Sequence, residues 1–400
     1  MFFAGIDWSE DHHEVVVLGA DREKVDTCRV PHSAEGLSEL TARLRRLHPP
    51  EEIACIVETR HGLLIQALLQ AGFPVYPVNP CTVDRLRRPS RAKTDALDAW
   101  LLARHGCNEL DQLHRLEPDS PLLEELKLLT RDQKTLIREH TRLIQQLTAC
   151  LKAYYPLALS LFGKLSQPVT LQFLARYPTL ESLQKATADE ITALLRTQRY
   201  PKAREKAEAI LSSAHRLQMR ASAPTTRAKS RLMLALVQQI EILEEAIRDY
   251  DREIEALFFT HPDREIFQSL PGAGMRVASR MLCEWGEERS RYRSADGVCA
   301  LAGASPVPRE SGRFRGIHKR YACVKPFRDA CYQLAWCSVR CEPWAKEYYQ
   351  RKRKEGKSHS MAVRALSRTW IRIIYRMWMD KKPYQRDIFL QAQADHRPVA

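Results

Sequence analysis

The chain has 400 residues, of which 44% are hydrophobic and 28% are charged, and its formal net charge is +14. This composition predicts a soluble protein with two or three folded domains and excludes a membrane-spanning chain, because no stretch approaches the ~20 apolar residues of a bilayer span. The positive charge favours a polyanionic partner, most simply nucleic acid.

Cysteine spacing and the N-terminal residues indicate the cellular compartment in which the protein is expected. None of the 11 cysteines forms a CxxC pair, so we expect Cys323, Cys331, Cys337 and Cys341 to pack as small apolar residues in a reducing environment. Asp7 interrupts the N-terminal apolar run early, so no signal peptide is expected. The sequence therefore predicts a cytoplasmic protein without a membrane partner.

Residues 1–115 alternate short apolar runs with helical segments. Antiparallel strands are predicted at 2–8, 13–20 and 24–30, helices at 34–47, 61–72 and 94–106, and further strands at 51–59 and 73–80. Three antiparallel strands followed by helix, strand, helix, strand and helix is the element order of the ribonuclease-H-like fold. We therefore predict an α/β domain of that class over residues 1–115.

Four acidic residues in this domain predict a Mg²⁺ site. Asp7 and Glu58 each close an apolar strand, and Asp95 and Asp98 lie three residues apart on one predicted helix. Hard cations prefer carboxylate oxygens, and two Mg²⁺ ions ~3.5–4 Å apart can activate the attacking oxygen and stabilise the leaving oxygen of a phosphodiester. Taken singly, each acid could be a solvated surface residue, and Asp95 could be a first-turn acid behind a Thr94 cap.

The middle of the chain, residues 116–260, is predicted to be a helical arm. Leucine and isoleucine recur at steps near 3.5 over residues 121–155 and 230–258, which predicts two long helices paired as an antiparallel coiled coil. A polar helical insertion, roughly 157–228, separates them. The stripes could form a spacer arm, an oligomer contact or simply core.

Residues 261–345 are predicted to form a second, mostly helical unit, followed by a basic helical tail over residues 346–400. A PGAG turn with Gly272 and Gly274 opens one helix. It resembles the hairpin of helix-hairpin-helix DNA binders, where backbone amides at a helix start hold a phosphate.

Basic residues are concentrated in two places. The segment 84–93 leads directly into the acidic helix, and from residue 311 to 376 there are 17 Lys and Arg against 4 Asp and Glu. The predicted nucleic-acid contacts are Arg85, Arg87, Arg88, Arg91, Lys93, Gly272, Gly274, Arg309, Arg313, Arg315, Lys319, Arg320, Arg351, Lys352, Arg353 and Lys354.

The tail also interleaves aromatic residues with arginines. Trp370, Tyr375 and Trp378 would suit stacking on single-stranded or folded RNA. The alternative is a helix that packs these rings inward. His12 and His13 are expected to precede a strand without binding a metal.

The chain resembles the DEDD transposases of the insertion-sequence one-ten family, the bridge-RNA-guided recombinases. The segments that carry the resemblance are GIDWSEDHHEVVV, IVET, AKTDALDAWLLAR, SLPGAGMRVASRMLCEWG, RYRSADGVCALAGASPVPRESGRFRG and HKRYACVKPFRDACYQLAW. In three places this chain departs from the family pattern: Arg313 follows Gly312, where a second glycine is common, HKRYACVKPFRD replaces the usual Lys-Arg-Gly-Asn/Asp run, and the tail beyond Glu342 is longer.

The resemblance implies a RuvC-like catalytic domain joined through a coiled coil to a C-terminal transposase domain. It implies that a structured noncoding guide RNA reads target and donor DNA, and that a dimer or tetramer shares active sites between protomers. The family's four metal-binding acids match Asp7, Glu58, Asp95 and Asp98, and its serine nucleophile matches Ser311.

The chemistry around Ser311 is compatible with that role. A serine hydroxyl is a weak nucleophile until a base or a metal activates it. Arg309, Arg313 and Arg315 flank Ser311 and could hold the scissile phosphate. Ser305 and Tyr321 are the competing nucleophiles.

Three functions follow from the sequence. The first is an RNA-guided, Mg²⁺-dependent DNA recombinase that forms a phosphoserine–DNA intermediate. The second is a junction-resolving or hydrolytic nuclease of the same fold with water as the nucleophile. The third is a non-catalytic RNA-binding protein.

Overall fold

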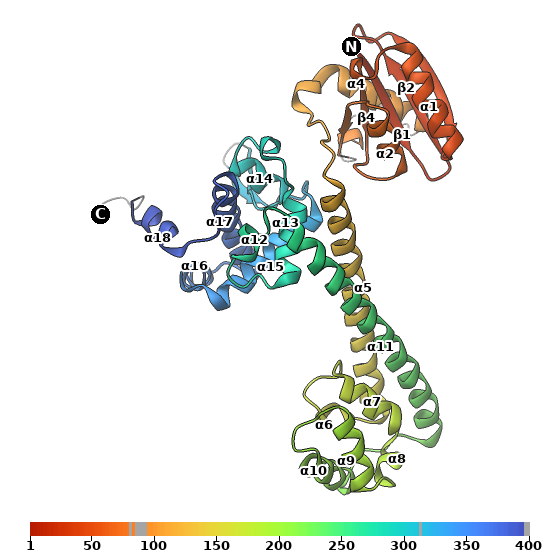
Figure 1. The fold of residues 1–400 in the computed structure, drawn as a ribbon, viewed down its shortest axis with the longest axis vertical. Coiled ribbons are helices and arrows are strands. Elements are labelled where there is room, and N and C mark those ends of the chain that lie inside the picture. Colours follow the sequence, from red (N-terminus) through yellow and green to blue (C-terminus); the bar gives the residue numbers. More distant parts are fainter. Residues whose placement is uncertain (80–81, 85–93, 312–313, 396–400) are drawn as a thin grey trace. The chain divides into compact units, whose positions relative to one another are not determined.

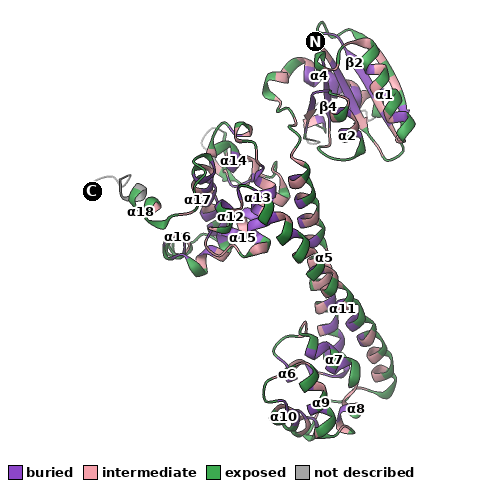
Figure 2. Cartoon of the chain, viewed as in Figure 1, coloured by how far each residue is buried: buried purple, intermediate pink, exposed green. Residues whose placement is uncertain are grey.

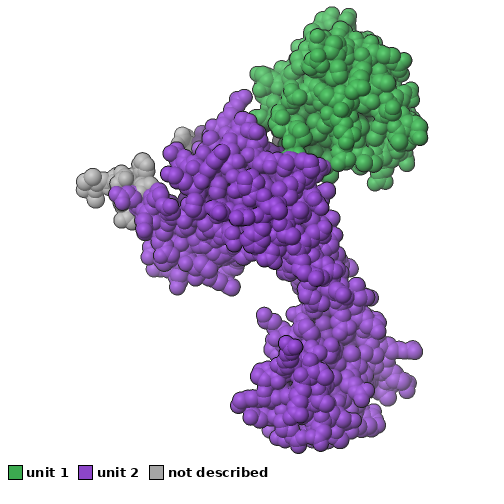
Figure 3. Space-filling model, viewed as in Figure 1, with its two compact units in different colours: residues 1–119 green, residues 120–400 purple. Residues whose placement is uncertain are grey.

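The computed structural model describes residues 1–79, 82–84, 94–311 and 314–395 (Figure 1). The chain divides into two compact units, Met1–Asp119 and Ser120–Ala400 (Figure 3). Within the described ranges, no helix combines the length and the apolarity needed to cross a membrane. The predicted contact residues Arg85, Arg87, Arg88, Arg91, Lys93 and Arg313 lie outside these ranges.

The first unit is built on a five-stranded sheet with strand order β3-β2-β1-β4-β5. The strands are β1 (Phe2–Trp8), β2 (His12–Leu18), β3 (Lys24–Pro31), β4 (Ile53–Val57) and β5 (Val75–Pro77). The first three strands are antiparallel, whereas β4 and β5 run parallel to β1. The predicted element order is confirmed, but His12 and His13 are the first residues of β2 and do not precede it.

Helices cover both faces of this sheet. They are α1 (Ala34–Leu47), α2 (Leu63–Gln70) and α4 (Asp95–Glu109), with short 3-10 turns at Pro50–Glu52 and Leu110–Gln112. Ala4 and Ile6 of β1 pack in the same cluster as Leu40 of α1 and Leu64 of α2. Phe3 packs with Leu102 of α4 instead. Since side chains alternate along a strand, odd-numbered residues of β1 face α4 and even-numbered ones face α1 and α2.

Gly5 allows α4 to cross the sheet closely. A Cβ atom at this position would lie 2.0 Å from the carbonyl oxygen of Ala99 and 2.3 Å from the backbone nitrogen of Ala103. Only glycine fits under the helix at this crossing, and the backbones of β1 and α4 meet there. The crossing lies two residues before Asp7 and one residue after Asp98.

The second unit contains two long helices, α5 (Pro121–Tyr154) and α11 (Ala223–Thr260). The Gln133 amide donates a hydrogen bond of 2.8 Å to Asp251, and His140 lies 3.3 Å from Glu244. Residue numbers rise along one helix as they fall along the other, so the pair is antiparallel as predicted. That it supercoils remains a prediction.

The segment that connects α5 to α11 along the chain folds into a small helical subdomain. Its helices are α6 (Ala158–Leu161), α7 (Pro168–Arg176), α8 (Leu180–Gln184), α9 (Ala188–Thr197) and α10 (Ala203–His215). Phe173, Leu183 and Ile191 are fully buried in a core that also includes Leu147 of α5 and Ile240 of α11. The insertion predicted as polar therefore has an apolar interior.

The remaining helices pack around a second core in this unit. They are α12 (Arg264–Gln268), α13 (Met275–Trp285), α14 (Ala295–Leu301), α15 (Lys325–Cys341), α16 (Pro343–Lys354), α17 (His359–Met379) and α18 (Arg386–Asp395), with a 3-10 turn at Arg289–Arg291. A two-stranded antiparallel ribbon, β6 (Val307–Ser311) and β7 (Phe314–His318), follows α14. The sequence did not predict this ribbon.

The aromatic residues of α17 decide one open prediction. Trp370 is 1% exposed and its indole N–H donates to Ser338 Oγ at 2.8 Å, while Trp378 is fully buried against Trp285. Figure 2 colours the whole chain by burial. Tyr375 is partly buried and donates to the carbonyl oxygen of Tyr292 at 3.3 Å. The stacking role considered for Trp370 and Trp378 is therefore wrong, because both rings belong to the hydrophobic core.

Candidate active site

The register of β1 and β4 brings two of the predicted acids to one edge of the sheet. Asp7 is the second-last residue of β1, and Glu58 directly follows β4. Ile6 is paired with Val57 in parallel register, so the next residues, Asp7 and Glu58, are neighbours across the two strands. Parallel strands present their carboxyl ends at the same edge, which is where ligand sites of such sheets occur.

Both acids also belong to the α4 face of the sheet. Asp7 continues the face of Phe3 and Gly5, which meet α4. Ala54 and Ile56 of β4 pack in the same cluster as Leu102 of α4, and Glu58 continues their alternation. The two carboxylates are therefore directed by the pleat towards the helix that carries Asp95 and Asp98.

The first turn of α4 supplies the other two acids. Thr94 caps the helix, since its hydroxyl oxygen accepts a hydrogen bond of 3.2 Å from the backbone N–H of Leu97. Asp95 is 55% exposed at its side chain, whereas Asp98 is 2% exposed. Asp98 directly precedes Ala99, where α4 touches Gly5 of β1. The Thr94 cap considered from the sequence is present.

The acids do not yet form a preassembled cation site. Within the described residues, no three His, Cys, Asp or Glu side chains lie close enough together to hold a metal ion. The donor set itself, four carboxylates, fits Mg²⁺.

A histidine that the sequence analysis set aside lies beside this site. The Nε2 atom of His12 is 3.5 Å from a carboxylate oxygen of Asp95. Arg29 of β3 approaches the same ring, with its guanidinium nitrogen 2.7 Å from Nε2, and lies 3.5 Å from Glu14. These contacts connect the outer strands to Asp95. The double histidine before an apolar run was the only sequence signal for them.

His13, the next residue of β2, lies on the opposite face of the sheet from His12 and differs from it in burial. It is completely buried, and its Nε2 lies 2.9 Å from Nδ1 of His32. Burial, together with the neighbouring His32 and His12, lowers the pKa of His13 to about 4. His13 is therefore neutral at physiological pH.

Ser311 belongs to the second unit and is exposed. It is the last residue of β6, and in the register of the ribbon it lies opposite Phe314 of β7. The sequence predicted a Gly-flanked loop here, whereas Ser311 is part of a strand; Gly312 and Arg313 lie outside the described residues. Arg309 lies two residues earlier on the same strand and is exposed, so it shares the face of Ser311. In the same backbone register Glu310 lies opposite Arg315.

The competing nucleophiles are placed differently. Ser305 is half-buried before the ribbon, and its backbone N–H donates to the carbonyl oxygen of Cys299 at 3.1 Å. Tyr321 is 78% exposed and Lys319 lies 5.4 Å from its ring centroid. Exposure alone therefore disfavours Ser305 and leaves Tyr321 as the accessible alternative to Ser311.

The PGAG turn is built as the sequence suggested. Gly272 has φ = +78°, and a Cβ atom there would lie 2.9 Å from the backbone of Cys337 on α15. Gly274 is the N-cap of α13 and no side chain caps that helix end. Its role in binding phosphate stays a prediction, as do those of Arg320 and the α16 cations Arg351 and Lys352.

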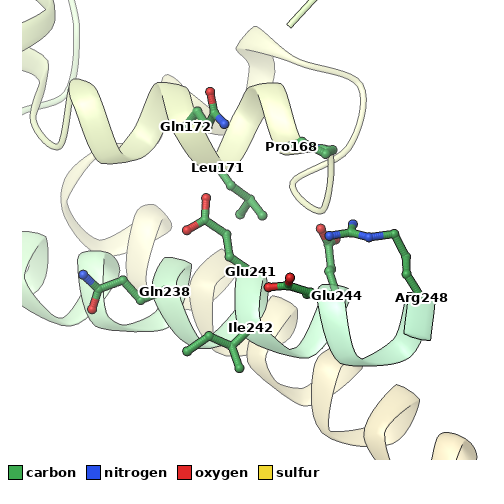
Figure 4. A pocket seen from close by; sticks show the side chains of 9 residues that line it. Pro168, Leu171, Gln172, Gln238, Glu241, Ile242, Glu244 and Arg248 are labelled. Atoms are coloured by element: carbon green, nitrogen blue, oxygen red, sulfur yellow. The ribbon is translucent and has the colours of Figure 1, made fainter. Parts of the chain in front are cut away.

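A cavity of about 450 Å³ lies elsewhere in the second unit, between α7 and α11. Figure 4 shows Glu241 extending from α11 towards Leu171 of α7. Glu244 and Glu245 also line it, with Arg248 at one end. This acidic lining repels phosphates, so the nucleic-acid contacts are to be sought on the basic surfaces.

Two family models match the chain. A model described as a transposase, of the DEDD type named for IS110, matches residues 4–156. A model described as the transposase IS116/IS110/IS902 family matches residues 264–350. The first match includes all four acids, and the second includes Ser311 and the PGAG turn.

Relatives match over nearly the full length. The mini-circle putative transposase for IS117 of Streptomyces coelicolor is 30% identical over 91% of this chain and 90% of its own length. An uncharacterized 42 kDa protein of insertion element IS900 from Mycobacterium paratuberculosis is 29% identical over 96% of each chain. Thermus thermophilus RuvC with a Holliday junction matches 29% of this chain and 99% of its own, at 19% identity and a TM-score of 0.23. That likeness is too weak to assign the fold, which rests on the strand order.

Proposed function

Because the chain belongs to the IS110/IS116/IS902 family of transposases, we propose that it cuts and rejoins DNA strands when an insertion element moves. The observation that carries the proposal is that Asp7 and Glu58 are neighbours at one edge of the sheet, on the face covered by α4, whose first turn holds Asp95 and Asp98. Carboxylate oxygens are the ligands that Mg²⁺ prefers.

In this proposal the four acids hold Mg²⁺. When bound, the metal activates the attacking oxygen and stabilises the leaving oxygen of the phosphodiester. Asp7 is held in place by the pairing of β1 with β2, and Asp98 by its burial at the helix crossing, while Glu58 directly follows β4. Asp95, which is more exposed, is oriented by His12.

Ser311 is proposed as the nucleophile. Its Oγ would form a bond to phosphorus while the bond from phosphorus to the leaving strand end breaks. The hydroxyl proton leaves Oγ, and the released strand end takes up a proton to become a hydroxyl. Attack by a strand-end hydroxyl on the phosphoserine reverses these changes, so the strands are rejoined without an energy-rich cofactor. Arg309, exposed on the same face, would stabilise the charge that develops on the phosphate.

The proposal extends to a guide RNA and to an oligomer. We infer that a structured noncoding RNA selects target and donor DNA, and that a dimer or tetramer combines the carboxylates of one protomer with the serine of another. Family membership and the excess of cations between residues 311 and 376 support this part.

The test uses the full-length protein with a radiolabelled DNA substrate and its guide RNA. Wild-type protein should yield a protein–DNA adduct that survives denaturation, and Ser311→Ala should yield none. Asp7→Asn should lower strand cleavage by at least about 10³-fold, since metal stabilisation of the transition state amounts to several kcal/mol. Ser305→Ala, a nearby half-buried serine, is the matched control and should retain the adduct.

Other outcomes select the alternatives. Full-rate cleavage by Ser311→Ala without any adduct would identify a hydrolytic nuclease with water as the nucleophile. An adduct that Tyr321→Phe removes would identify the tyrosine as the nucleophile. Absence of strand cleavage by the wild-type protein, with RNA binding that Asp7→Asn leaves unchanged, would point to a non-catalytic RNA-binding protein.

A further inference from the structure

Three aromatic rings form an exposed cluster on the second unit. Trp336 of α15 lies with its ring centroid 5.5 Å from that of Tyr349 of α16 and 4.7 Å from that of His359 of α17. The Tyr349 hydroxyl and Nδ1 of His359 are 2.9 Å apart. The three rings, which come from three helices, hold one another in edge-to-face contacts, so their positions are defined before any partner binds.

The exposure of Trp336 is unusual for this unit. Trp285, Trp370 and Trp378 are at most 1% exposed, whereas Trp336 is 37% exposed and His359 is also exposed. Met361, two residues after His359 along α17, is 47% exposed. An accessible aromatic ring offers a face on which an unpaired base can stack.

Positive charge is concentrated in the segment of the chain that carries this aromatic cluster. Residues 336–361 contain seven Lys and Arg and three Glu. Of the three acids, Glu342 is buried and ion-paired with Arg386, and Glu355 is paired with Lys352 at 2.8 Å. Arg351 lies 5.1 Å from the ring centroid of Tyr348. Arg353 and Lys354 are exposed. The surface therefore offers stacking faces and free cations together.

We propose that Trp336, Tyr349 and His359, with the cations of α16, bind unpaired nucleotides of a single-stranded nucleic acid. An exposed aromatic ring stacks on the face of an unpaired base, and nearby cations neutralise the phosphates. In a duplex the bases stack on one another, so their faces are not available. A second copy of this chain that met this surface with its own copy of it would bring the exposed cations Arg353 and Lys354 against each other, so it is disfavoured as the occupant.

The inference rests on the proposed function, because it names the kind of nucleic-acid strand that the protein binds. It assigns base stacking to rings other than those considered from the sequence. Trp370 and Trp378 are in the core, and the accessible stacking residues lie on α15, α16 and the start of α17. RNA and DNA single strands share this chemistry, so the experiment includes both.

The test measures fluorescence anisotropy of fluorescein-labelled oligouridine and oligothymidine of about 12 nucleotides, and of a duplex of equal length, with the full-length protein. Trp336→Ala should raise the Kd for the single strands by roughly 5- to 150-fold, the effect of losing one stacked base. The Kd for the duplex should change less than about twofold. Trp336→Phe should restore most of the affinity.

Phe259→Ala is the matched control, because Phe259 is 38% exposed on α11 and should not affect binding. A second variant, Arg353→Ser with Lys354→Ser, keeps the test valid if Trp336→Ala fails to fold. It should reduce the slope of log affinity against log salt by about 1.4, since each phosphate contact with a single strand contributes about 0.7.

Unchanged single-strand affinity in both variants, or equal weakening for duplex and single strands, would overturn the proposal. A change in sedimentation with unchanged oligonucleotide binding would identify an interface between copies and would also overturn it. If only one oligonucleotide loses affinity, the surface is selective for that sugar. DNA cleavage by Asp7→Asn is measured separately, so failure of this site and failure of the proposed function give different results.

Discussion

The two units present their proposed catalytic groups in opposite ways. In the first, Asp7 and Asp98 flank the point where α4 presses on Gly5, and the neighbouring residues Ala4, Ile6 and Ala99 are fully buried. In the second, Ser311 ends a ribbon whose β6 residues are mostly exposed and whose Ile317 is 78% exposed. An isolated two-stranded ribbon is marginally stable in water.

This difference fits the different requirements of a metal site and a nucleophile. Metal ligands need fixed positions, because misplacement of a carboxylate by a fraction of an ångström weakens a hard-cation site. A nucleophile that must reach a phosphate, and later release it, can be carried by an element that its substrate orders. The following predictions test whether packing in the first unit and exposure in the second have these consequences.

The largest effect is expected for Gly5→Ala. The added Cβ would lie 2.0 Å from the Ala99 carbonyl oxygen, a backbone atom that cannot turn away, so α4 must shift. We expect the free energy of unfolding of the first unit to fall by about 3 kcal/mol or more, with loss of metal binding. Chemical denaturation followed by circular dichroism measures the loss. Gly163→Ala, where a Cβ meets no atom within 4 Å, is the control.

Acid should destabilise the first unit through His13. Its pKa is lowered to about 4 in the folded protein against 6.5 in the unfolded chain, so the unfolded chain binds the proton first. The stability from neutral, buried His13 is present above pH 6.5 and is lost as pH falls towards 4, by about 3 kcal/mol. Denaturation curves at several pH values should show that the free energy of unfolding falls less between pH 6.5 and pH 4 for His13→Gln than for the wild-type protein. An identical pH dependence in the two proteins would contradict this assignment.

A moderate effect is expected for His12→Ala. His12 contacts Asp95 at 3.5 Å, and removal of a group that orients a metal ligand typically weakens metal binding about 10- to 100-fold. Isothermal titration with Mn²⁺ or Mg²⁺ measures the affinity directly, and His12→Asn should recover part of it. His48→Ala serves as the control because His48 contacts Glu52, away from the four acids. Equal affinities for His12→Ala and wild type would exclude the positioning role.

The smallest effect is expected on the ribbon. Ile317→Thr keeps a β-branched residue at an exposed position, so the free energy of unfolding should change by no more than about 0.5 kcal/mol. Thermal unfolding compared with Gly5→Ala measures the contrast between the units. A loss above about 1 kcal/mol would show that the ribbon is packed more firmly than its exposure indicates.

Much of the first unit could be predicted from local sequence patterns. Alternating and continuous apolar runs indicated the strands, and Thr94, which caps α4, marked a helix start. The acids Asp7 and Glu58 were identified because each ends such a run. The role of Gly5 could not be predicted, because it depends on a helix more than ninety residues later in the chain.

The second unit was less predictable. The periodic stripes of α5 and α11 indicated long helices and their pairing, but the ribbon around Ser311 carries no strong alternation of apolar residues. The aromatic residues of α17 were ambiguous because helical spacing alone does not tell which face meets a core. Only packing against Trp285 and Ser338 decided that Trp370 and Trp378 are interior.

The sequence by itself determined the order of elements, the four candidate acids and the basic character of the C-terminal half, since these follow from local periodicity, capping and charge. The tertiary structure alone decided that Asp7 and Glu58 share a face with α4, that His12 contacts Asp95, and that Trp336 is the accessible indole among the C-terminal tryptophans. The physical reason is that register, helix crossing and burial are properties of contacts between residues far apart in the chain, which no local pattern contains.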